Sequence, residues 1–141
     1  MIARTTFAPL IRQHANRSTT RTIPCRSFHS ARTQWQHHLD ATPQQFNETI
    51  SSSKLVVVDF YADWCGPCRF LTPILKKVIN VDHDKVDLMT INTDDQQELA
   101  LKYKIRALPT VVAFKEGQAV GQFVGAKNEQ DVRQFVDNLI A

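Results

Sequence analysis

The sequence predicts an α/β domain with a central mixed β-sheet and helices on both faces of that sheet. From about residue 43 to residue 109, predicted helices and strands alternate, as they do when parallel strands are joined by right-handed crossovers. A glycine-containing turn then joins two further strands as a hairpin, which adds antiparallel pairing. The 141 residues are enough for one ordinary domain and too few for two.

The first helix and the first strand have clear signals. Thr42 and Gln45 are spaced as a capping box, and Pro43 falls at the first helical position, so we expect a helix from about 43 to 51. The stretch KLVVVDFYA at 54–62 contains a continuous apolar run with three valines. Such a run predicts a strand that is covered on both faces, as in the centre of a parallel sheet.

A second helix, a strand and a third helix are expected next. The helix at about 65–80 contains Pro73, which removes one backbone hydrogen bond and predicts a kink. VDLMTIN at 86–92 predicts a strand, and the segment 94–104 predicts a helix that Asp94 can cap. The apolar residues of the second helix recur at helical spacing: Phe70, Leu71, Ile74, Leu75, Val78 and Ile79.

The chain ends with a hairpin and a helix. Strands are expected near 110–115 and 119–124, joined at Glu116-Gly117, where glycine supplies a positive φ angle. Asn128 can cap the final helix. The apolar residues of this helix form one stripe: Val132, Phe135, Val136, Leu139 and Ile140.

The N-terminal segment differs in charge from the rest of the chain. Residues 1–39 contain no lysine and no acidic residue, and their arginines are spread singly: Arg4, Arg12, Arg17, Arg21, Arg26 and Arg32. The remaining residues hold 11 Lys and Arg against 14 Asp and Glu, a formal charge of −3. An arginine-rich, acid-free leader is typical of an organellar transit peptide. Because the positive balance is confined to this leader, it gives no reason to expect nucleic-acid binding by the folded part.

Two alternatives to a transit peptide are weaker. A secretory signal needs an apolar core of about 7–15 residues, and FAPLI at 7–11 is short and contains Pro9. A disordered nucleic-acid-binding arm more often contains clustered lysines. RSFHSAR at 26–32 resembles the Arg-x-Phe processing sites of imported proteins, so we predict a mitochondrial transit peptide at 1–28 and a mature domain at 29–141. No stretch has the about 18 consecutive apolar residues of a membrane span, so we expect no membrane partner.

The three cysteines separate into one in the leader and a close pair. Cys25 would be removed with the leader, which leaves Cys65 and Cys68, too few for a secreted disulfide scaffold. A buried structural pair is disfavoured because the Gly-Pro between the cysteines breaks the chain at a turn. A zinc site needs three or four protein ligands, and we expect no metal because the histidines of the domain lack ligand-like spacing: His37, His38 and His83.

The position of the pair favours redox chemistry. Cys65 falls at the N-terminus of a helix, where free backbone N–H groups and the positive end of the helix dipole stabilise a thiolate. Only the thiolate attacks disulfides, so a lowered pKa of the thiol increases the reactive fraction at neutral pH. Cys68 lies one turn later on the same face, and Pro67 stiffens the turn between them. These features predict a disulfide that can be opened and closed.

From about residue 42 to residue 141 the chain resembles the thioredoxin family, most specifically in VVVDFYADWCGPC at 56–68. The resemblance implies the thioredoxin fold and a thiol–disulfide oxidoreductase that reduces protein disulfides. It implies that Cys65 is the attacking nucleophile and Cys68 the resolving thiol. Three further residues match the aromatic position beside the site and the dipeptide that tunes the pair towards reduction: Trp64, Gly66 and Pro67.

Asp59 is the third candidate catalytic residue. It follows three valines and precedes Phe60, so it is expected to be buried, and burial raises the pKa of a carboxyl group. A carboxylate of that kind can act as a base near neutral pH. The resemblance implies that Asp59 accepts the proton of the resolving cysteine. Read alone, the residue could also be a strand-end carboxylate that faces water.

A docking surface is expected beside the pair. Pro109 in RALPTVVAF matches the cis-proline of the family, which implies that it packs against the disulfide and that the backbone of Leu108 pairs with a target peptide. Gly125 matches a neighbouring loop, where glycine permits close approach of a partner. The expected docking patch is mostly apolar and consists of Trp64, Gly66, Pro67, Leu108 and Gly125.

Two positions depart from the family pattern. Many thioredoxins have tryptophan where Tyr61 stands, and a lysine often found near the buried aspartate is replaced by Thr90. Without that cation, the pKa of Asp59 should be higher than in family members that have one.

The resemblance also implies partners. We expect client proteins that contain disulfides, peroxiredoxin-type proteins among them, and re-reduction by an NADPH-dependent, flavin-containing thioredoxin reductase. The chain has no phosphate-cradling glycine loop, so no cofactor of its own is expected. We expect a monomer in the mitochondrial matrix. The alternatives are an oxidase or isomerase of the same fold, which the low polarity of Gly66-Pro67 disfavours, and a redox-gated binding module.

Overall fold

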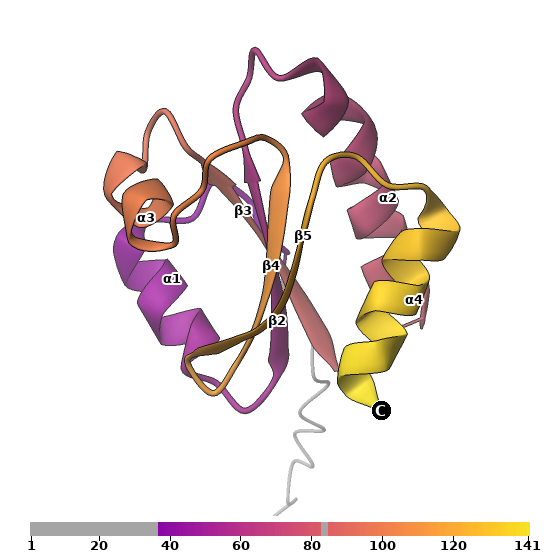
Figure 1. The fold of residues 1–141 in the computed structure, drawn as a ribbon. Coiled ribbons are helices and arrows are strands. Elements are labelled where there is room, and N and C mark those ends of the chain that lie inside the picture. Colours follow the sequence, from indigo (N-terminus) through magenta and orange to yellow (C-terminus); the bar gives the residue numbers. More distant parts are fainter. Residues whose placement is uncertain (1–36, 83–84) are drawn as a thin grey trace, which may run out of the picture. The chain divides into compact units, whose positions relative to one another are not determined.

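The computed structural model describes residues 37–82 and 85–141 of the chain. These residues form one five-stranded sheet with the strand order β1-β3-β2-β4-β5 (Figure 1). The first three strands are parallel to one another, and the last two are antiparallel to their neighbours. The strands are β1 (His37–His38), β2 (Leu55–Tyr61), β3 (Val86–Asn92), β4 (Thr110–Lys115) and β5 (Gln118–Val124).

Four helices cover the two faces of this sheet. Figure 1 shows α1 and α3 on one side of the sheet and α2 and α4 on the other. Their bounds are α1 (Pro43–Ile50), α2 (Gly66–Asp82), α3 (Gln97–Lys102) and α4 (Glu129–Ile140). The predicted mixed sheet with helices on both faces is therefore confirmed. The two-residue strand β1 was not predicted, because so short a segment has no periodicity to detect.

The core has two layers, one on each face of the sheet. Val57 of β2 packs in the layer beneath α2 and α4, whereas Val56 and Val58 pack in the layer beneath α1 and α3. All three valines are buried, as expected of a strand covered on both faces. In the second layer, the rings of Phe46 and Phe114 meet edge to face with their centroids 5.5 Å apart.

The predicted caps of α1 and α4 are present. The Gln45 backbone N–H donates to the Thr42 hydroxyl oxygen over 3.3 Å, and the Thr42 backbone N–H donates to the Gln45 side chain over 3.0 Å. Asn128 accepts a hydrogen bond from the backbone N–H of Asp131 at 2.9 Å. These contacts satisfy backbone groups that would otherwise lack partners at the helix starts.

The prediction that Asp94 caps the third helix was wrong. The helix α3 begins at Gln97, and its N-cap residue Gln96 makes no side-chain capping bond. The Asp94 carboxylate instead accepts a hydrogen bond from the indole Nε1–H of Trp64 at 2.9 Å. The Asp94 backbone N–H donates to Asn92 at 3.0 Å. Asp94 therefore belongs to the loop beside the cysteine pair and not to the start of α3.

Smaller differences concern two helices and the hairpin. The helix α2 continues through Pro73 to Asp82, and Phe70, one of the apolar residues at helical spacing, is exposed. In α4, Val132 and Val136 are buried but Ile140 at the C-terminal end is 37% exposed. In the hairpin turn both Glu116, with φ 51°, and Gly117, with φ 78°, are in the left-handed region, where only the glycine had been expected.

No helix within residues 37–82 and 85–141 is long and apolar enough to cross a membrane. The predictions for the leader, its processing site and Cys25 fall outside the described residues.

Candidate functional site

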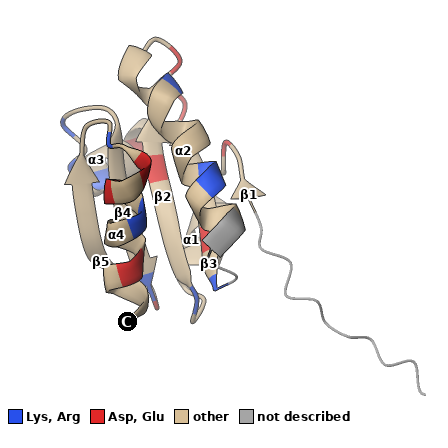
Figure 2. Ribbon diagram, turned by 90° about the vertical axis from the view of Figure 1, so that its right-hand side faces the viewer, with Lys and Arg blue, Asp and Glu red and all other residues tan. Residues whose placement is uncertain are grey.

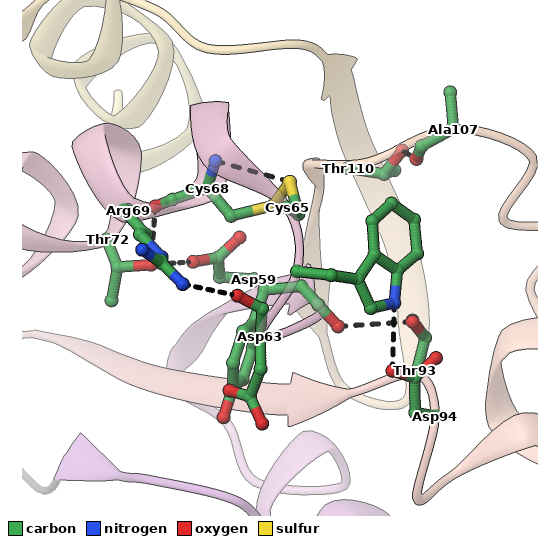
Figure 3. The surroundings of a disulfide bond; sticks show 12 residues. Asp59, Asp63, Cys65, Cys68, Arg69, Thr72, Thr93, Asp94, Ala107 and Thr110 are labelled. Carbon is green, nitrogen blue, oxygen red and sulfur yellow. Dashed lines mark hydrogen bonds between the residues drawn. A yellow bond between two sulfur atoms is a disulfide. The ribbon is translucent and has the colours of Figure 1, made fainter.

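The cysteine pair lies where β2 leads into α2. Cys65 immediately precedes the first residue of α2, and its Sγ is bonded to that of Cys68 with an S–S distance of 2.03 Å (Figure 3). Both residues are almost completely buried, with exposed fractions of 4% for Cys65 and 2% for Cys68. The exposed fractions alone therefore do not distinguish the nucleophile from the resolving thiol.

A backbone amide makes the difference between the two sulfurs. The Cys68 N–H donates to Sγ of Cys65 over 3.3 Å. The same sulfur lies at the N-terminus of the 17-residue helix α2, where the helix dipole is positive. When the disulfide is open, both effects favour the thiolate of Cys65 over its thiol. The geometry therefore supports the sequence-based assignment of Cys65 as the residue that attacks.

Asp59 lies beneath the pair, on the face of β2 that α2 covers. Its side chain is fully buried, as the valine run predicted. Burial raises the pKa of the Asp59 carboxyl group to about 6, and a hydrogen bond from the Thr72 hydroxyl partly opposes that rise. The bond joins Thr72 Oγ1 to Asp59 Oδ2 over 2.8 Å (Figure 3). A carboxyl group with this pKa can change its protonation state at physiological pH.

Most of the sheet carries no charge (Figure 2), so a carboxylate inside it is exceptional. Within the described residues, the buried acidic side chains are those of Asp59 and Asp87. Asp87 forms an ion pair with Lys54 over 3.3 Å. For Asp59 no ion pair is found in the described part of the chain, and no charged residue is among the causes of its raised pKa. The charged form of Asp59 is thus stabilised by a hydroxyl group and not by a cation.

The two departures from the family pattern, Tyr61 and Thr90, both form hydrogen bonds with Asp40. Thr90 is the direct neighbour of Asp59 on β3, but its Oγ1 accepts a hydrogen bond from the backbone N–H of Asp40 at 3.0 Å. The Tyr61 hydroxyl donates a hydrogen bond to the Asp40 carboxylate. Burial and this carboxylate both raise the pKa of Tyr61. Tyr61 and Thr90 therefore fasten the segment before α1 to the sheet.

The predicted docking residues surround the disulfide. Trp64 is 71% exposed, and Gly66 and Pro67 are exposed between the cysteines. Leu108 is partly buried and packs against the cluster formed by Ala62 and the two cysteines.

Pro109 and Gly125 complete this surface. The peptide bond before Pro109 is cis, as the resemblance implied. Gly125 has a φ angle of 88° and donates its N–H to the Pro109 carbonyl oxygen at 2.8 Å. This positive φ explains why glycine is required at the position. The loop after β5 is thereby held against the proline that precedes β4.

Thr72 and Phe70 are the residues that sequence reasoning missed. Thr72 lies one helical turn after Cys68, and a hydroxyl residue on the sheet-facing side of a helix next to a buried aspartate was a usable signal. Phe70 was counted among the apolar residues at helical spacing, but 73% of it is exposed on α2. The helix has apolar residues on more of its circumference than the sheet covers, and spacing alone did not show which of them face outward.

Known proteins are similar to this chain in sequence and in fold. The family model for thioredoxin matches residues 37–138. The mitochondrial thioredoxin of Rattus norvegicus is 39% identical over 118 residues, which cover 83% of this chain and 71% of the rat protein. The mitochondrial thioredoxin of Bos taurus is 44% identical over 98 residues, which cover 70% of this chain and 59% of the bovine protein. The crystal structure of Malassezia sympodialis thioredoxin is similar with a TM-score of 0.69 and 33% identity over 74% of this chain and 94% of that one.

The mixed sheet, the disulfide at the start of α2 and the buried carboxylate below it define a thiol–disulfide oxidoreductase that works by dithiol–disulfide exchange. The chain belongs to the thioredoxin family.

The effect of having Thr90 in place of a lysine can be tested by introducing the lysine. In Thr90→Lys, an ammonium group placed on the strand next to Asp59 should favour the carboxylate and lower the pKa of Asp59 below the wild-type value. Titration of the Asp59 carboxyl carbon by NMR measures this pKa. Thr90→Met is the matched control, because it also removes the Thr90 hydroxyl but adds no charge. An unchanged or higher pKa in the lysine variant would contradict the expectation.

The raised pKa of Asp59 also predicts how stability depends on pH. Between about pH 4 and pH 6 the folded protein retains a proton on Asp59 that the unfolded chain releases, so stability falls as the pH rises through this window. Above the window Asp59→Asn should be more stable than the wild type, by at most about 3 kcal/mol. Urea unfolding of the oxidised proteins at pH 4 and pH 8 measures the difference. If the two proteins showed the same pH dependence, Asp59 would not have a raised pKa.

Proposed function

We propose that this protein reduces disulfides in other proteins, with Cys65 as nucleophile, Cys68 as resolving thiol and Asp59 as the base that assists Cys68. The observation that carries the proposal is the hydrogen bond from the Cys68 N–H to Sγ of Cys65, which supports the thiolate of Cys65 at the start of α2. The burial of Asp59 beneath the pair supports its role as base.

The reaction proceeds in two exchanges. The Cys65 thiolate attacks one sulfur of the client disulfide, so a Cys65–client disulfide forms and the other client sulfur leaves as a thiolate. Cys68 then loses its proton to Asp59, and its thiolate attacks Sγ of Cys65. The Cys65–Cys68 disulfide forms while the second client thiolate leaves. Two electrons have passed from the protein to the client, and the proton held by Asp59 is released to solvent.

Client binding is assigned to the docking patch of Trp64, Gly66, Pro67, Leu108 and Gly125. These residues are mostly apolar, and one of them, Leu108, packs against a disulfide that is itself nearly buried. The backbone of Leu108, next to the cis-proline Pro109, would pair with an extended client segment. Recognition through backbone bonds and apolar contact suits many clients, including peroxiredoxin-type proteins. We propose that the protein acts as a monomer.

The oxidised pair must be reduced again after each cycle. We propose that an NADPH-dependent, flavin-containing thioredoxin reductase supplies the two electrons by exchange with the Cys65–Cys68 disulfide. NADPH and the flavin are then held by the partner, and this chain needs no cofactor of its own.

We also propose that residues 1–28 direct the protein to the mitochondrial matrix and that residues 29–141 are the mature form. The arginine-rich, acid-free composition of the leader supports import. The similarity to rat and bovine proteins named mitochondrial thioredoxins supports the same organelle.

Reductase activity is tested with insulin as the client disulfide. Purified residues 29–141 with thioredoxin reductase and NADPH should consume NADPH continuously and precipitate the insulin chains. Cys65→Ser should abolish turnover, whereas Cys68→Ser should form the first mixed disulfide and accumulate it as covalent adducts with several clients. No turnover by the wild type would refute the proposal, and one tight noncovalent partner in place of adducts would favour a binding module.

Import is tested with a C-terminally tagged full-length chain. The tag should be found in the mitochondrial matrix, and mass spectrometry should place the mature N-terminus near residue 29. Replacing Arg4, Arg12 and Arg17 by glutamine should leave the chain unprocessed in the cytosol, because the import signal depends on positive charge. An unprocessed wild-type chain outside mitochondria would show that the leader has another role.

A further inference from the structure

Thr72 stands between the buried carboxylate and the resolving cysteine. Its Oγ1 lies 2.8 Å from Oδ2 of Asp59 and 3.1 Å from the carbonyl oxygen of Cys68. We propose that Thr72 is a positioning residue for the second exchange: it binds one carboxylate oxygen of Asp59 and leaves the other oxygen to receive the proton of Cys68. This inference rests on the proposed role of Asp59 as base.

The position of Thr72 in the helix places the hydroxyl at this point. Thr72 follows Cys68 by four residues in α2, so the two residues lie on the same face one turn apart. Side chains in a helix lean towards its N-terminus, which directs the Thr72 hydroxyl back to the carbonyl group of Cys68. Asp59 meets it from the strand below. One hydroxyl therefore contacts both residues that take part in the proton transfer.

A hydroxyl group has one proton, so its two contacts are alternatives. When Asp59 is ionised, the Thr72 hydroxyl donates to Oδ2, because a hydrogen bond to a charged oxygen is the stronger one. When Asp59 has taken up the proton, the hydroxyl can turn to the Cys68 carbonyl oxygen. Thr72 thus has a partner in both protonation states of Asp59 without a change in the backbone.

The second oxygen of Asp59 is the one left for the proton. Oδ1 is buried and has no hydrogen-bond partner among the described residues. In Figure 3, Oδ2 is turned to Thr72 while the other oxygen points to the side of the cysteines. An oxygen that accepts no hydrogen bond is the better proton acceptor of the two, because its charge is less stabilised. Rotation of the carboxyl group would break the bond to Thr72, so that bond keeps Oδ1 on this side.

The surroundings place no competing charge on Asp59. Thr72 and Cys68 line a depression of the surface together with Tyr61, Asp63 and Arg69. The Arg69 guanidinium donates a hydrogen bond to the backbone carbonyl oxygen of Asp63 over 3.0 Å. From the neighbouring strands, uncharged residues are paired with Asp59, namely Thr90 of β3 and Val111 of β4. The depression thus gives access to Cys68 and Thr72, whereas Asp59 itself is fully buried.

The first experiment measures the pKa of Asp59 in two variants of Thr72. Thr72→Val keeps the shape of the side chain and removes the donor, so the pKa of Asp59 should rise by about one unit. Thr72→Ser keeps the hydroxyl and should leave the pKa near the wild-type value. Titration of the Asp59 carboxyl carbon by NMR distinguishes the two. Equal pKa values in the valine variant and the wild type would overturn the inference.

The second experiment separates the two exchanges in time. A symmetric aromatic disulfide releases one coloured thiolate when Cys65 attacks and the second when Cys68 resolves the mixed disulfide, so the absorbance rises in two phases. Thr72→Val should leave the first phase unchanged. It should slow the second phase about fivefold at pH 6 and about twofold at pH 7, because less of Asp59 is ionised. Thr72→Ser should behave as the wild type.

Asp59→Asn distinguishes failure of the inference from failure of the proposed function. When Thr72→Val is added to Asp59→Asn, it should cause no further slowing, since Thr72 acts through the carboxylate. Equal slowing by Thr72→Val in the wild type and in Asp59→Asn would show a merely structural effect and overturn the inference. If Asp59→Asn alone left the second phase unchanged, Asp59 would not be the base that assists Cys68. That part of the proposed function would then fail, and the kinetic part of the inference would fail with it. The shift in the pKa of Asp59 would then remain as an independent result.

Discussion

The geometry of the site depends on the junction between the end of β2 and the start of α2. The strand is buried on both faces, and the helix is anchored to the sheet by buried side chains such as Leu71 and Leu75. The start of the helix is therefore fixed relative to the strand, and the Cys68 amide stays directed at the Cys65 sulfur. Since Gly66 and Pro67 alone separate the two cysteines, the sulfur–sulfur bond can form or break within one turn of chain. The reactivity of the thiol follows from this rigidity, because a mobile helix start could not hold its amides on one atom.

The same junction includes a feature that opposes folding. A carboxyl group with a raised pKa is a group that the protein would bury more easily in its neutral form, and its ionisation weakens the folded state. The rest of the core offsets this cost with two continuous apolar layers, one on each face of the sheet. Asp87 shows the alternative solution in the same sheet, since its buried carboxylate is paired with the partly exposed Lys54. A buried acid without a cation thus lowers the stability of the folded state, and such a cost agrees with the proposed role of Asp59 as a base.

Most of this architecture could be predicted from the sequence, because most helices and strands are determined by residues close together in the chain. The capping box at Thr42, the valine run and the hairpin glycine each determine structure within a few residues, and the structure confirms them. The failures concern choices that tertiary contacts make. Asp94 could cap a helix or bind an indole, and only the fold brings Trp64 within reach of it. Phe70 has the spacing of a core residue, but its side chain on α2 is exposed. Thr72 was missed for the same reason, since its partner comes from another element, the strand β2.

The bond between Trp64 and Asp94 has a consequence for molecular recognition. The indole is largely exposed, yet its N–H is held by a carboxylate on the loop after β3. A large aromatic side chain on a surface normally samples several rotamers, and a ligand that uses it must immobilise it at an entropic cost. In this protein, part of that entropy is already lost on folding, because the hydrogen bond to Asp94 restrains the Trp64 side chain. The hydrogen bond thus restricts the orientation of the ring before binding. With the proposed role of Trp64 in docking, a client could use the contact area of the ring without first having to immobilise it.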